Sequence, residues 1–232
     1  VGNRLTETID GNLNTYNYNN RDQLLSVTGT DKNIVQTFDD NGRLVTKVED
    51  GKTSTYTWVD NDRMATATTE GVTTEFGYDI SGKKVAETTG GSTKYYLWDK
   101  TLPWSQVIAE YTSTSNPTAT YVYGLERISQ VRSGTTSTYI ADGQGSIRQL
   151  LADDESVQNN YIYSAFGETV ASSGAIENYF KYTGEEFNNN VGFYNLRARY
   201  YNANVGRFNK MDAYQGELKM PESLHRYAYV KN

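Results

Sequence analysis

The sequence lacks cysteine and has one histidine, His225, among its 232 residues. Without cysteine the chain forms neither a disulfide framework nor a thiolate zinc site. A single histidine excludes a histidine-based catalytic triad and a histidine-rich metal site, so we expect no metal and no cofactor. We expect His225, beside Arg226 and Tyr227, to have a structural role in the last packed segment.

Long apolar runs and an excess of positive charge are also missing. No stretch of about 18 apolar residues occurs, so the sequence predicts no membrane span. The net charge of −6 argues against a nucleic-acid partner, because phosphate binding requires clustered positive charge. No signal peptide is visible, and because Val1 is not a natural start we expect the sequence to be a fragment of a longer chain.

Tyrosine and glycine are abundant, with 20 of each against 3 prolines. Tyrosine buries its ring and keeps its hydroxyl wet, which suits half-buried strands better than a helical core. Plentiful glycine with little proline is typical of tight hairpin turns. The composition therefore favours an all-β fold.

A repeat of twenty residues runs through the first hundred. Aromatic residues recur at Tyr18, Phe38, Trp58, Tyr78 and Trp98, and a second aromatic lies two positions earlier at Tyr16, Tyr56, Phe76 and Tyr96, with Gln36 as the exception. Polar turns such as "FDDNGRL" and "YDISGKK" follow, and a second turn glycine recurs at Gly51, Gly71 and Gly91. Aromatics and turns in one register indicate a true repeat rather than chance recurrence.

Each repeat predicts one β-hairpin. Because side chains alternate along a strand, an aromatic-x-aromatic pair places both rings on one face. Gly42 and Gly82 supply the left-handed residue of a short turn. One hairpin is too small to be stable alone, so we expect the units to stack into a continuous sheet with an aromatic ladder. The turn residues Asp39, Asp40, Asp60 and Asp62 do not continue into an EF-hand loop, and we expect them to be solvated.

The strict period ends after Trp98. A Ser/Thr-rich excursion containing Pro103 and Pro117 follows, and aromatic pairs resume in "YVYG", "YIYSAFGE" and "YFKYTGEE". The segment "YIADGQGSIRQLLADD" predicts a strand, a glycine-rich turn and a second strand, and it lacks the lysine and helix of a phosphate-binding loop. Only "GEEFNNNV" and "PESLHRYAYV" predict a helical turn or two.

These phrases resemble a known family. The unit Y-x-[YFW]-D-x-x-G-[RK]-L is similar to the YD repeat of RHS and teneurin proteins. The phrases "DGQGSIRQLLADD", "YIYSAFGE" and "YTGEEFNNNVGFYNLRARYYNANVGRFNKMDAY" resemble the RHS repeat-associated core domain. The resemblance covers nearly the whole chain, and it implies YD-type hairpin repeats over 1–100, an irregular connection with continuing strands over 101–138, and the core domain over 139–232.

The resemblance also implies a fold and a setting. YD repeats wind as a spiralling β-sheet that forms a hollow shell, and the core domain closes its end. Relatives include bacterial polymorphic toxins, Tc toxin C components and teneurins, so the implied location is secreted or at the bacterial cell surface. The implied partners are the remaining YD repeats and a C-terminal effector of the same parent chain. We therefore expect a structural, non-enzymatic module at the end of such a shell.

The stretch "GFYNLRARYYNANVGRF" matches the central strands of that core. We expect "FYNLRARYY" to be one strand, with Tyr194, Leu196, Ala198 and Tyr200 on one face and Phe193, Asn195, Arg197, Arg199 and Tyr201 on the other. We expect "NANVG" to form a bulged hairpin to a return strand. The predicted structural core is Arg197, Arg199, Tyr200, Tyr201, Gly206, Arg207 and Phe208. We expect the arginines to stack on aromatic rings and to pair with Glu185 or Glu186, rather than to form an anion or sugar site.

Self-cleavage is the first alternative function. Family members that cut themselves resemble aspartic proteases and use two aspartates that share a proton, the first in a D-P-x-G-L phrase. Asp212 matches that first position, but Ala213 replaces the proline, the G-L phrase is absent and no second aspartate follows. Asp212 is thus the one candidate catalytic residue, and we expect it to be a turn residue that accepts a bond from Arg207 or Arg226.

Adhesion is the second alternative function. In that case the aromatic side chains contact cell-surface glycans or proteins, and replacing Trp58 or Trp98 abolishes glycan binding. A longer parent chain with a second aspartate beyond Asn232 would instead favour self-cleavage. The first hairpin would also leave a bare sheet edge able to pair with a preceding repeat.

Overall fold

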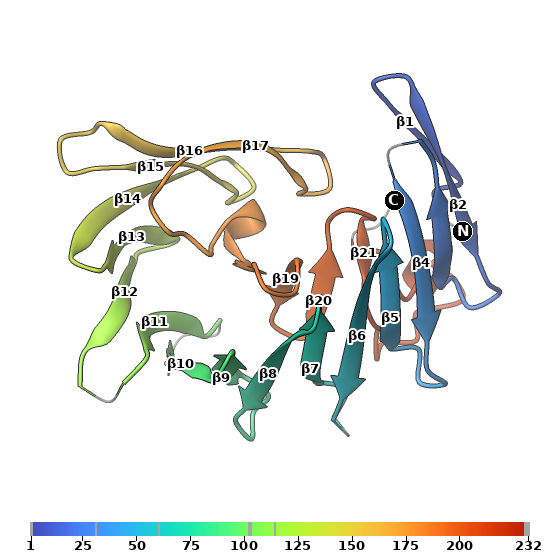
Figure 1. Cartoon of the computed structure of the whole chain (residues 1–232), viewed down its shortest axis with the longest axis horizontal. Coiled ribbons are helices and arrows are strands. Elements are labelled where there is room, and N and C mark those ends of the chain that lie inside the picture. Colours follow the sequence, from blue (N-terminus) through green and yellow to red (C-terminus); the bar gives the residue numbers. More distant parts are fainter. Residues whose placement is uncertain (1, 31, 60, 102–103, 114, 230–232) are drawn as a thin grey trace.

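The computed structural model describes residues 2–30, 32–59, 61–101, 104–113 and 115–229. This part of the chain is all-β, with a seventeen-stranded antiparallel sheet, a four-stranded sheet and two short 3-10 turns (Figure 1). The structure therefore confirms the predicted fold class of β-hairpin repeats in a curved sheet.

Most strands are five to seven residues long, and they divide into a large outer sheet and a small central one. The large sheet contains β1 (Thr6–Ile9), β2 (Asn12–Tyr18), β3 (Leu24–Thr28), β4 (Asn33–Phe38), β5 (Leu44–Glu49), β6 (Lys52–Trp58), β7 (Met64–Thr69), β8 (Val72–Tyr78), β9 (Lys84–Thr89), β10 (Ser92–Asp99), β11 (Gln106–Tyr111), β12 (Pro117–Tyr123), β13 (Arg127–Arg132), β14 (Thr135–Ala141), β15 (Ile147–Leu151), β16 (Val157–Tyr163) and β17 (Thr169–Gly174). The small sheet contains β18 (Glu186–Asn188), β19 (Phe193–Leu196), β20 (Arg199–Asn202) and β21 (Arg207–Phe208), and the 3-10 turns are η1 (Tyr182–Gly184) and η2 (Pro221–Leu224).

Each strand of the large sheet pairs antiparallel with the next strand along the chain, from β1 to β17. Such a meander needs only short hairpin turns. Figure 1 shows the sheet curling into a C, with the four-stranded sheet in its middle. The strands β1 and β17 are the two edges: β1 pairs with β2 and β17 pairs with β16, and neither has a described partner on its outer side.

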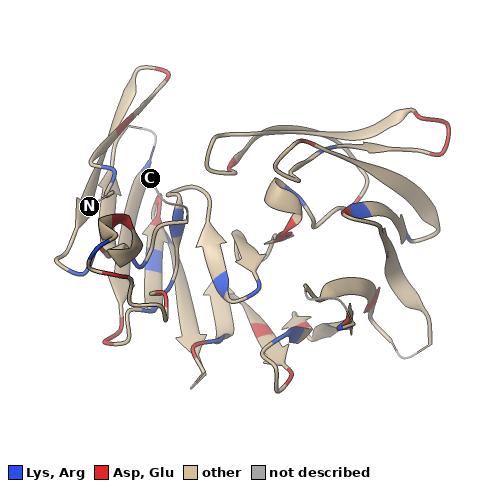
Figure 2. Cartoon of the chain, turned by 180° about the vertical axis from the view of Figure 1, so that it is seen from behind, with Lys and Arg blue, Asp and Glu red and all other residues tan. Residues whose placement is uncertain are grey.

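Two kinds of turn alternate along the meander. At one end of the hairpins, pairs such as Asp50 and Gly51 have positive φ angles of 49° and 79°, as type I′ turns require. At the other end an acidic or amide side chain accepts backbone N–H groups. The Asp79 carboxylate accepts from Ser81 and Lys83, both at 2.9 Å, and Gly82 then takes a positive φ of 76°. Acidic side chains accordingly mark several hairpin tips in Figure 2.

The paired aromatics of each repeat have different roles. The first, such as Tyr56, faces inward and is 2% exposed. The ladder shifts register between Thr57 and Trp58, and the Trp58 indole donates a hydrogen bond of 2.8 Å to the Leu44 carbonyl of the preceding repeat strand. The same bond recurs at 2.8–2.9 Å from Tyr78 to Met64, Trp98 to Lys84, Tyr123 to Val107, and Tyr163 to Ile147. The second aromatic therefore ties neighbouring strands together through its polar end.

The chain after β17 turns inward and supplies the core of the molecule. Val191, Phe193 and Tyr200 pack against the inward-facing residues of β5 to β8, including Tyr56 and Phe76. Phe180 packs within the aromatic group of β10 to β16, and Val205 packs against β2 to β4. One returning segment thus covers inward residues along most of the curved sheet.

Two local predictions are wrong. "FYNLRARYY" is a hairpin rather than one strand, because Arg197 has a φ of 64° and β19 pairs with β20. Tyr201 therefore lies opposite Tyr194, and Tyr200 lies opposite Asn195, which exchanges their predicted faces. "GEEFNNNV" holds strand β18 instead of a helical turn.

Two further local predictions are confirmed. The segment "PESL" forms the 3-10 turn η2. Arg207 and Phe208 form the return strand β21, which pairs antiparallel with β20.

Candidate functional site

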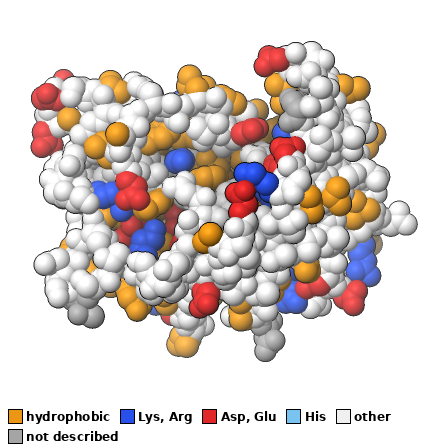
Figure 3. Space-filling model, in the orientation of Figure 1, with side chains coloured by type: hydrophobic (Ala, Val, Ile, Leu, Met, Phe, Trp, Pro, Cys, Tyr) orange, Lys and Arg blue, Asp and Glu red, His pale blue; other side chains and the backbone are white. Residues whose placement is uncertain are grey.

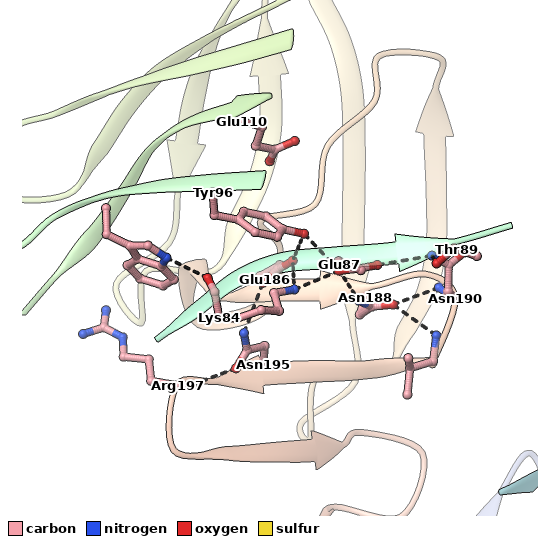
Figure 4. Close-up of polar contacts among 12 residues, drawn as sticks. Lys84, Glu87, Thr89, Tyr96, Glu110, Glu186, Asn188, Asn190, Asn195 and Arg197 are labelled. Atoms are coloured by element: carbon pink, nitrogen blue, oxygen red, sulfur yellow. Dashed lines mark hydrogen bonds and ion pairs between the residues drawn. The ribbon is translucent and has the colours of Figure 1, made fainter. Parts of the chain in front are cut away.

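The site that joins the two sheets is a buried polar network at Lys84 (Figure 4). Lys84 begins β9 and points inward, and its side chain is 1% exposed. Its ammonium lies 2.6 Å from the Glu186 carboxylate of β18 and 3.0 Å from the Glu87 carboxylate of its own strand. The Tyr96 hydroxyl donates to both carboxylates at 3.0 and 3.2 Å. One lysine thus connects the outer sheet to the central sheet.

Asparagine side chains of the small sheet complete the network. Asn188 donates to Glu87 at 2.9 Å, and Asn195 donates to Glu186 at 3.2 Å. Asn190 reaches Glu87 and the Thr89 hydroxyl, both at 3.3 Å. A buried carboxylate is stable only when its oxygens accept hydrogen bonds. The asparagine amides supply N–H donors to the carboxylate oxygens in addition to those of the single lysine.

The electrostatics favour the charged form of the network. Burial alone would lower the pKa of Lys84, but the charges of Glu186 and Glu87 outweigh it and raise that pKa above its usual value. Burial opposes ionisation of Glu87, yet Lys84 and Lys94 hold the pKa of Glu87 below its usual range. Burial and the two carboxylates raise the pKa of the Tyr96 phenol, so it remains a hydrogen-bond donor.

A second polar group binds the returning segment further along the sheet. Arg132 of β13 lies 3.0 Å from the buried Glu110 carboxylate and 3.2 Å from Glu177 of the returning segment. The Tyr121 hydroxyl donates to Glu110 at 2.6 Å. The returning segment is therefore held by charge at two places and by aromatic packing between them.

The predicted arginine–aromatic core divides in two. Arg197 occupies the β19–β20 turn, where its guanidinium lies 3.4 Å from Glu185. Its amide N–H donates to the Asn195 side chain at 3.1 Å, and its carbonyl accepts from Arg63 at 2.7 Å. These bonds stabilise a left-handed turn that has no glycine. The expected pairing of an arginine with Glu185 is confirmed at this position.

Arg199 and Arg207, the other two arginines of the predicted core, lie over aromatic rings. The Arg199 guanidinium lies 3.5 Å from the centre of the Phe208 ring, and the Arg207 guanidinium lies 4.9 Å from that of Tyr18. Tyr200 and Tyr201 are 5% and 0% exposed. Gly206 has a positive φ of 69°, and the Phe166 ring would crowd a Cβ there at 3.1 Å.

Asp212 lies in a partly exposed turn and pairs with arginine. Its carboxylate lies 2.7 Å from the Arg199 guanidinium and accepts the Tyr214 amide N–H at 3.0 Å. The Arg226 side chain donates to the Asp212 backbone carbonyl at 2.9 Å. Among its contacts in the described part of the chain there is no second carboxylate. A catalytic role for Asp212 stays a prediction.

Sequence reasoning missed Lys84 and Glu186, although the repeat itself carried a signal for the first. The inward position that opens each second strand holds Leu24, Leu44, Met64 and Lys84 at a spacing of twenty. A lysine in a register position that is otherwise apolar predicts a buried partner. Glu186 had no such signal, because the small sheet does not repeat.

The remaining candidate sites have simpler structures. Among the described residues no group of three metal-ligating side chains comes together, and no helix is long and apolar enough to cross a membrane. Asp39 and Asp62 both pair with Arg43, while Asp60 lies outside the described residues. Trp58 and Trp98 are half-buried and use their indole N–H groups on backbone carbonyls. Glycan adhesion through these rings stays a prediction.

Comparisons with known proteins give partial relatives. No family model matches the chain. "Salivary gland surface protein 1" of Aedes aegypti is 30% identical over 117 residues, which are 49% of this chain and 3% of that protein. "tRNA3(Ser)-specific nuclease WapA" of Bacillus spizizenii is 29% identical over 131 residues, 54% of this chain and 6% of that protein. The chain thus spans a small part of the curated relatives it matches.

Solved structures match over almost the whole chain. The crystal structure of TcdB2-TccC3-Cdc42 matches 95% of this chain and 15% of that one, with a TM-score of 0.58 and 14% identity. A Photorhabdus luminescens Tc holotoxin pore with a mutated TccC3 matches 95% of this chain and 15% of that one, with a TM-score of 0.56 and 15% identity. At this identity the likeness concerns the fold. The chain has the fold of an RHS-type β-shell segment.

Proposed function

We propose that this chain is a non-enzymatic closing segment of an RHS-type β-shell. One observation carries the proposal: the segment after Gly174 turns inward and docks on the concave face through the buried Lys84–Glu186 ion pair of 2.6 Å. The docked sheet fixes the curvature of the outer sheet, because its buried charges are paired and its side chains close-packed only when the two surfaces lie in one relative position. The 3% and 6% coverage of the curated relatives supports a role as part of a larger chain.

The proposal includes the setting and the division of the chain. The parent is a secreted bacterial protein, and the closed shell encloses or presents a C-terminal effector; the likeness to Tc toxin components supports this assignment. The division remains YD-type repeats over 1–100, a connection over 101–138 and the core domain over 139–232. The large sheet continues across both boundaries, so these units share one sheet.

The natural protein tests the setting first. Its intact mass and terminal peptides are expected to show a parent much longer than 232 residues. A natural protein that begins near Val1 and ends near Asn232 would contradict both the larger shell and the C-terminal effector.

Limited proteolysis of that parent then tests closure. The segment that follows Asn232 is expected to resist protease in the wild type and to become cleavable in Lys84→Met, because an unpaired Glu186 loosens the docked sheet. Lys52→Met removes an exposed pair with Glu70 and is expected to leave protection unchanged. Equal cleavage in wild type and Lys84→Met, with Lys84→Met shown to be destabilised by denaturant titration, would contradict closure.

A further inference from the structure

A polar pocket of about 330 Å³ borders the Lys84 network at Arg197, whose amide N–H donates to Asn195. It forms where the turns that follow β12 and β14 face η1 and the β19–β20 turn. Figure 3 shows the molecule hollowed left of centre, with Lys or Arg and Asp or Glu side chains on the walls. Small-molecule sites occupy about 300 to 1,000 Å³, so this pocket fits a ligand of roughly one ring.

Arg127 lines the pocket and makes no ion pair within 4.0 Å among the described residues, although its charge acts on Glu185 from a longer distance. Its guanidinium lies 3.3 Å from the centre of the Phe180 ring and donates to the Tyr123 hydroxyl at 3.1 Å and the Gly184 carbonyl at 2.9 Å. Its hydrogen-bond and ring partners among the described residues include no carboxylate. A guanidinium fixed in this way presents its remaining N–H groups in one plane, which suits a carboxylate.

The acidic residues of the pocket do not fill that role. Glu185 pairs with Arg197 at 3.4 Å, and Glu126 is exposed at the mouth, where solvent screens it. Figure 4 shows the Arg197 guanidinium directed away from the Lys84 network. The pocket interior therefore holds two arginines and one half-buried carboxylate: Arg197 forms an ion pair with Glu185, and Arg127 acts on Glu185 only from beyond ion-pair distance.

Neutral polar groups line the rest of the pocket. The side-chain amides of Gln106 and Gln144 line it and have no hydrogen-bond partner among the described residues. The Thr183 hydroxyl lies on the same wall, and the Tyr123 ring supplies an aromatic surface. Planar amides with an aromatic wall are groups that bind several hydroxyls on one ring.

We propose that this pocket binds a small hydroxylated carboxylate of the sugar-acid class. The ligand carboxylate pairs with Arg127, and its ring hydroxyls bond to Gln106 and Gln144. Because every one of these residues lies outside the Lys84 network, the proposal is independent of shell closure.

Isothermal titration calorimetry on the full chain tests the proposal with three probes: sodium glucuronate, glucose and sodium acetate. Glucuronate is expected to bind more tightly than either of the others. Arg127→Gln is expected to weaken glucuronate binding at least about tenfold, in keeping with the loss of a charge-assisted bidentate pair. Arg127→Lys keeps the charge but not the planar fork, and an intermediate loss is expected.

Two further variants keep the test decisive. Gln144→Ala changes an exposed side chain, so it is expected to fold normally and to weaken glucuronate binding without changing acetate binding. Arg21→Gln removes an exposed arginine outside the pocket and is the matched control. Equal binding of glucose would overturn the carboxylate assignment, and equal binding of acetate would overturn the sugar assignment. Absence of glucuronate binding to the folded wild type would overturn the proposal as a whole.

Discussion

At the scale of single residues, a buried ion pair adds to apolar packing where the central sheet docks on the outer sheet. Lys84 replaces the leucine or methionine of the equivalent repeat positions and finds Glu186 at 2.6 Å across the interface. A buried ion pair adds little net stability over an apolar pair, but an unpaired buried charge is strongly destabilising. The pair therefore penalises every docking register except the observed one.

The first prediction concerns that pair. Lys84→Met is expected to lower the free energy of unfolding by about 3–5 kcal/mol, because it leaves the buried Glu186 and Glu87 carboxylates without their shared cation. Glu186→Met is expected to lower it less, because Lys84 keeps its ion pair with Glu87 at 3.0 Å. The double variant is expected to lose less than the sum of the two single changes. Urea denaturation of the four proteins measures this coupling.

Lys52→Met is the matched control, since Lys52 and its partner Glu70 are 65% and 57% exposed in their side chains. It is expected to change the free energy of unfolding by less than about 1 kcal/mol. Additive losses in the double variant would show that Lys84 and Glu186 act independently.

The second prediction concerns Asp212. In Asp212→Asn the partly exposed pair with Arg199 is lost, and the free energy of unfolding is expected to fall by about 1 kcal/mol or less. If Asp212 were catalytic, the parent chain would stop cutting itself in Asp212→Asn. Gel electrophoresis and mass spectrometry of the wild-type and variant parents are expected to show the same fragments, apart from the small mass change of the substitution itself.

For single residues, the sequence predicted what kind of contact an arginine makes better than it predicted which residue the arginine contacts. Stacking of Arg199 and Arg207 on aromatic rings followed from composition alone, because an arginine among tyrosines has few other partners. The sequence did not predict the hairpin at Arg197, because turn residues with a positive φ are usually glycine or asparagine. Here the Asn195 side chain and Arg63 hold the turn instead, and Arg63 is 134 residues away in the chain.

At the scale of elements, the repeat is a hairpin with two differently built ends. The Asp50–Gly51 end needs left-handed backbone at both residues, whereas the other end uses a carboxylate or amide to collect backbone N–H groups. This difference explains why Asn or Asp follows the second aromatic in most repeats, at Asn19, Asp39 and Asp79, and why a glycine follows the second strand. Because both kinds of turn recur every twenty residues, the sequence alone predicted where they lie.

The third prediction tests that difference. Gly51→Ala places a side chain at a φ of 79° with no neighbour within 4 Å, so only backbone strain opposes it. We expect a loss of about 1–2 kcal/mol in the free energy of unfolding. Gly143→Ala is the matched control, because Gly143 also has open space but no positive φ. Thermal unfolding of both variants gives the comparison, and equal midpoints would contradict the assigned turn type.

At the scale of the whole molecule, one sheet of seventeen strands is held in a curve by a segment that follows it in sequence. Periodicity predicted the meander, because each strand contacts its immediate neighbour. The inward docking of the four-stranded sheet depends on contacts between residues about a hundred positions apart, such as Lys84 with Glu186. No periodic signal encodes such contacts, so the resemblance alone suggested a closing domain.

The fourth prediction follows from the lowered pKa of Glu87. A carboxyl group with a lowered folded pKa contributes stability above its unfolded pKa, near 4.3, and loses that contribution as the pH falls through the folded value. The wild type is therefore expected to lose stability between about pH 5 and pH 2, and Glu87→Gln is expected to show a shallower loss. Urea midpoints across this range measure it, and parallel curves would contradict the charged network.

The most direct test of inward docking uses the absence of cysteine in this chain. Arg43 and Lys210 form an isolated antiparallel bridge between the start of β5 and the segment after β21. The flanking bonds, Leu44 N–H to Asn209 and Met211 N–H to Gly42, make it a non-hydrogen-bonded pair, whose Cα atoms lie about 4.5 Å apart. That separation suits a disulfide.

In the double variant Arg43→Cys, Lys210→Cys, mild oxidation is expected to form an intramolecular disulfide, seen as a loss of two hydrogens in the intact mass. Arg43→Cys with Asp212→Cys, two residues out of register, is expected to form much less of it. A folded Arg43→Cys, Lys210→Cys protein that stays reduced, or that links only between molecules, would contradict docking of the C-terminal segment inside the sheet.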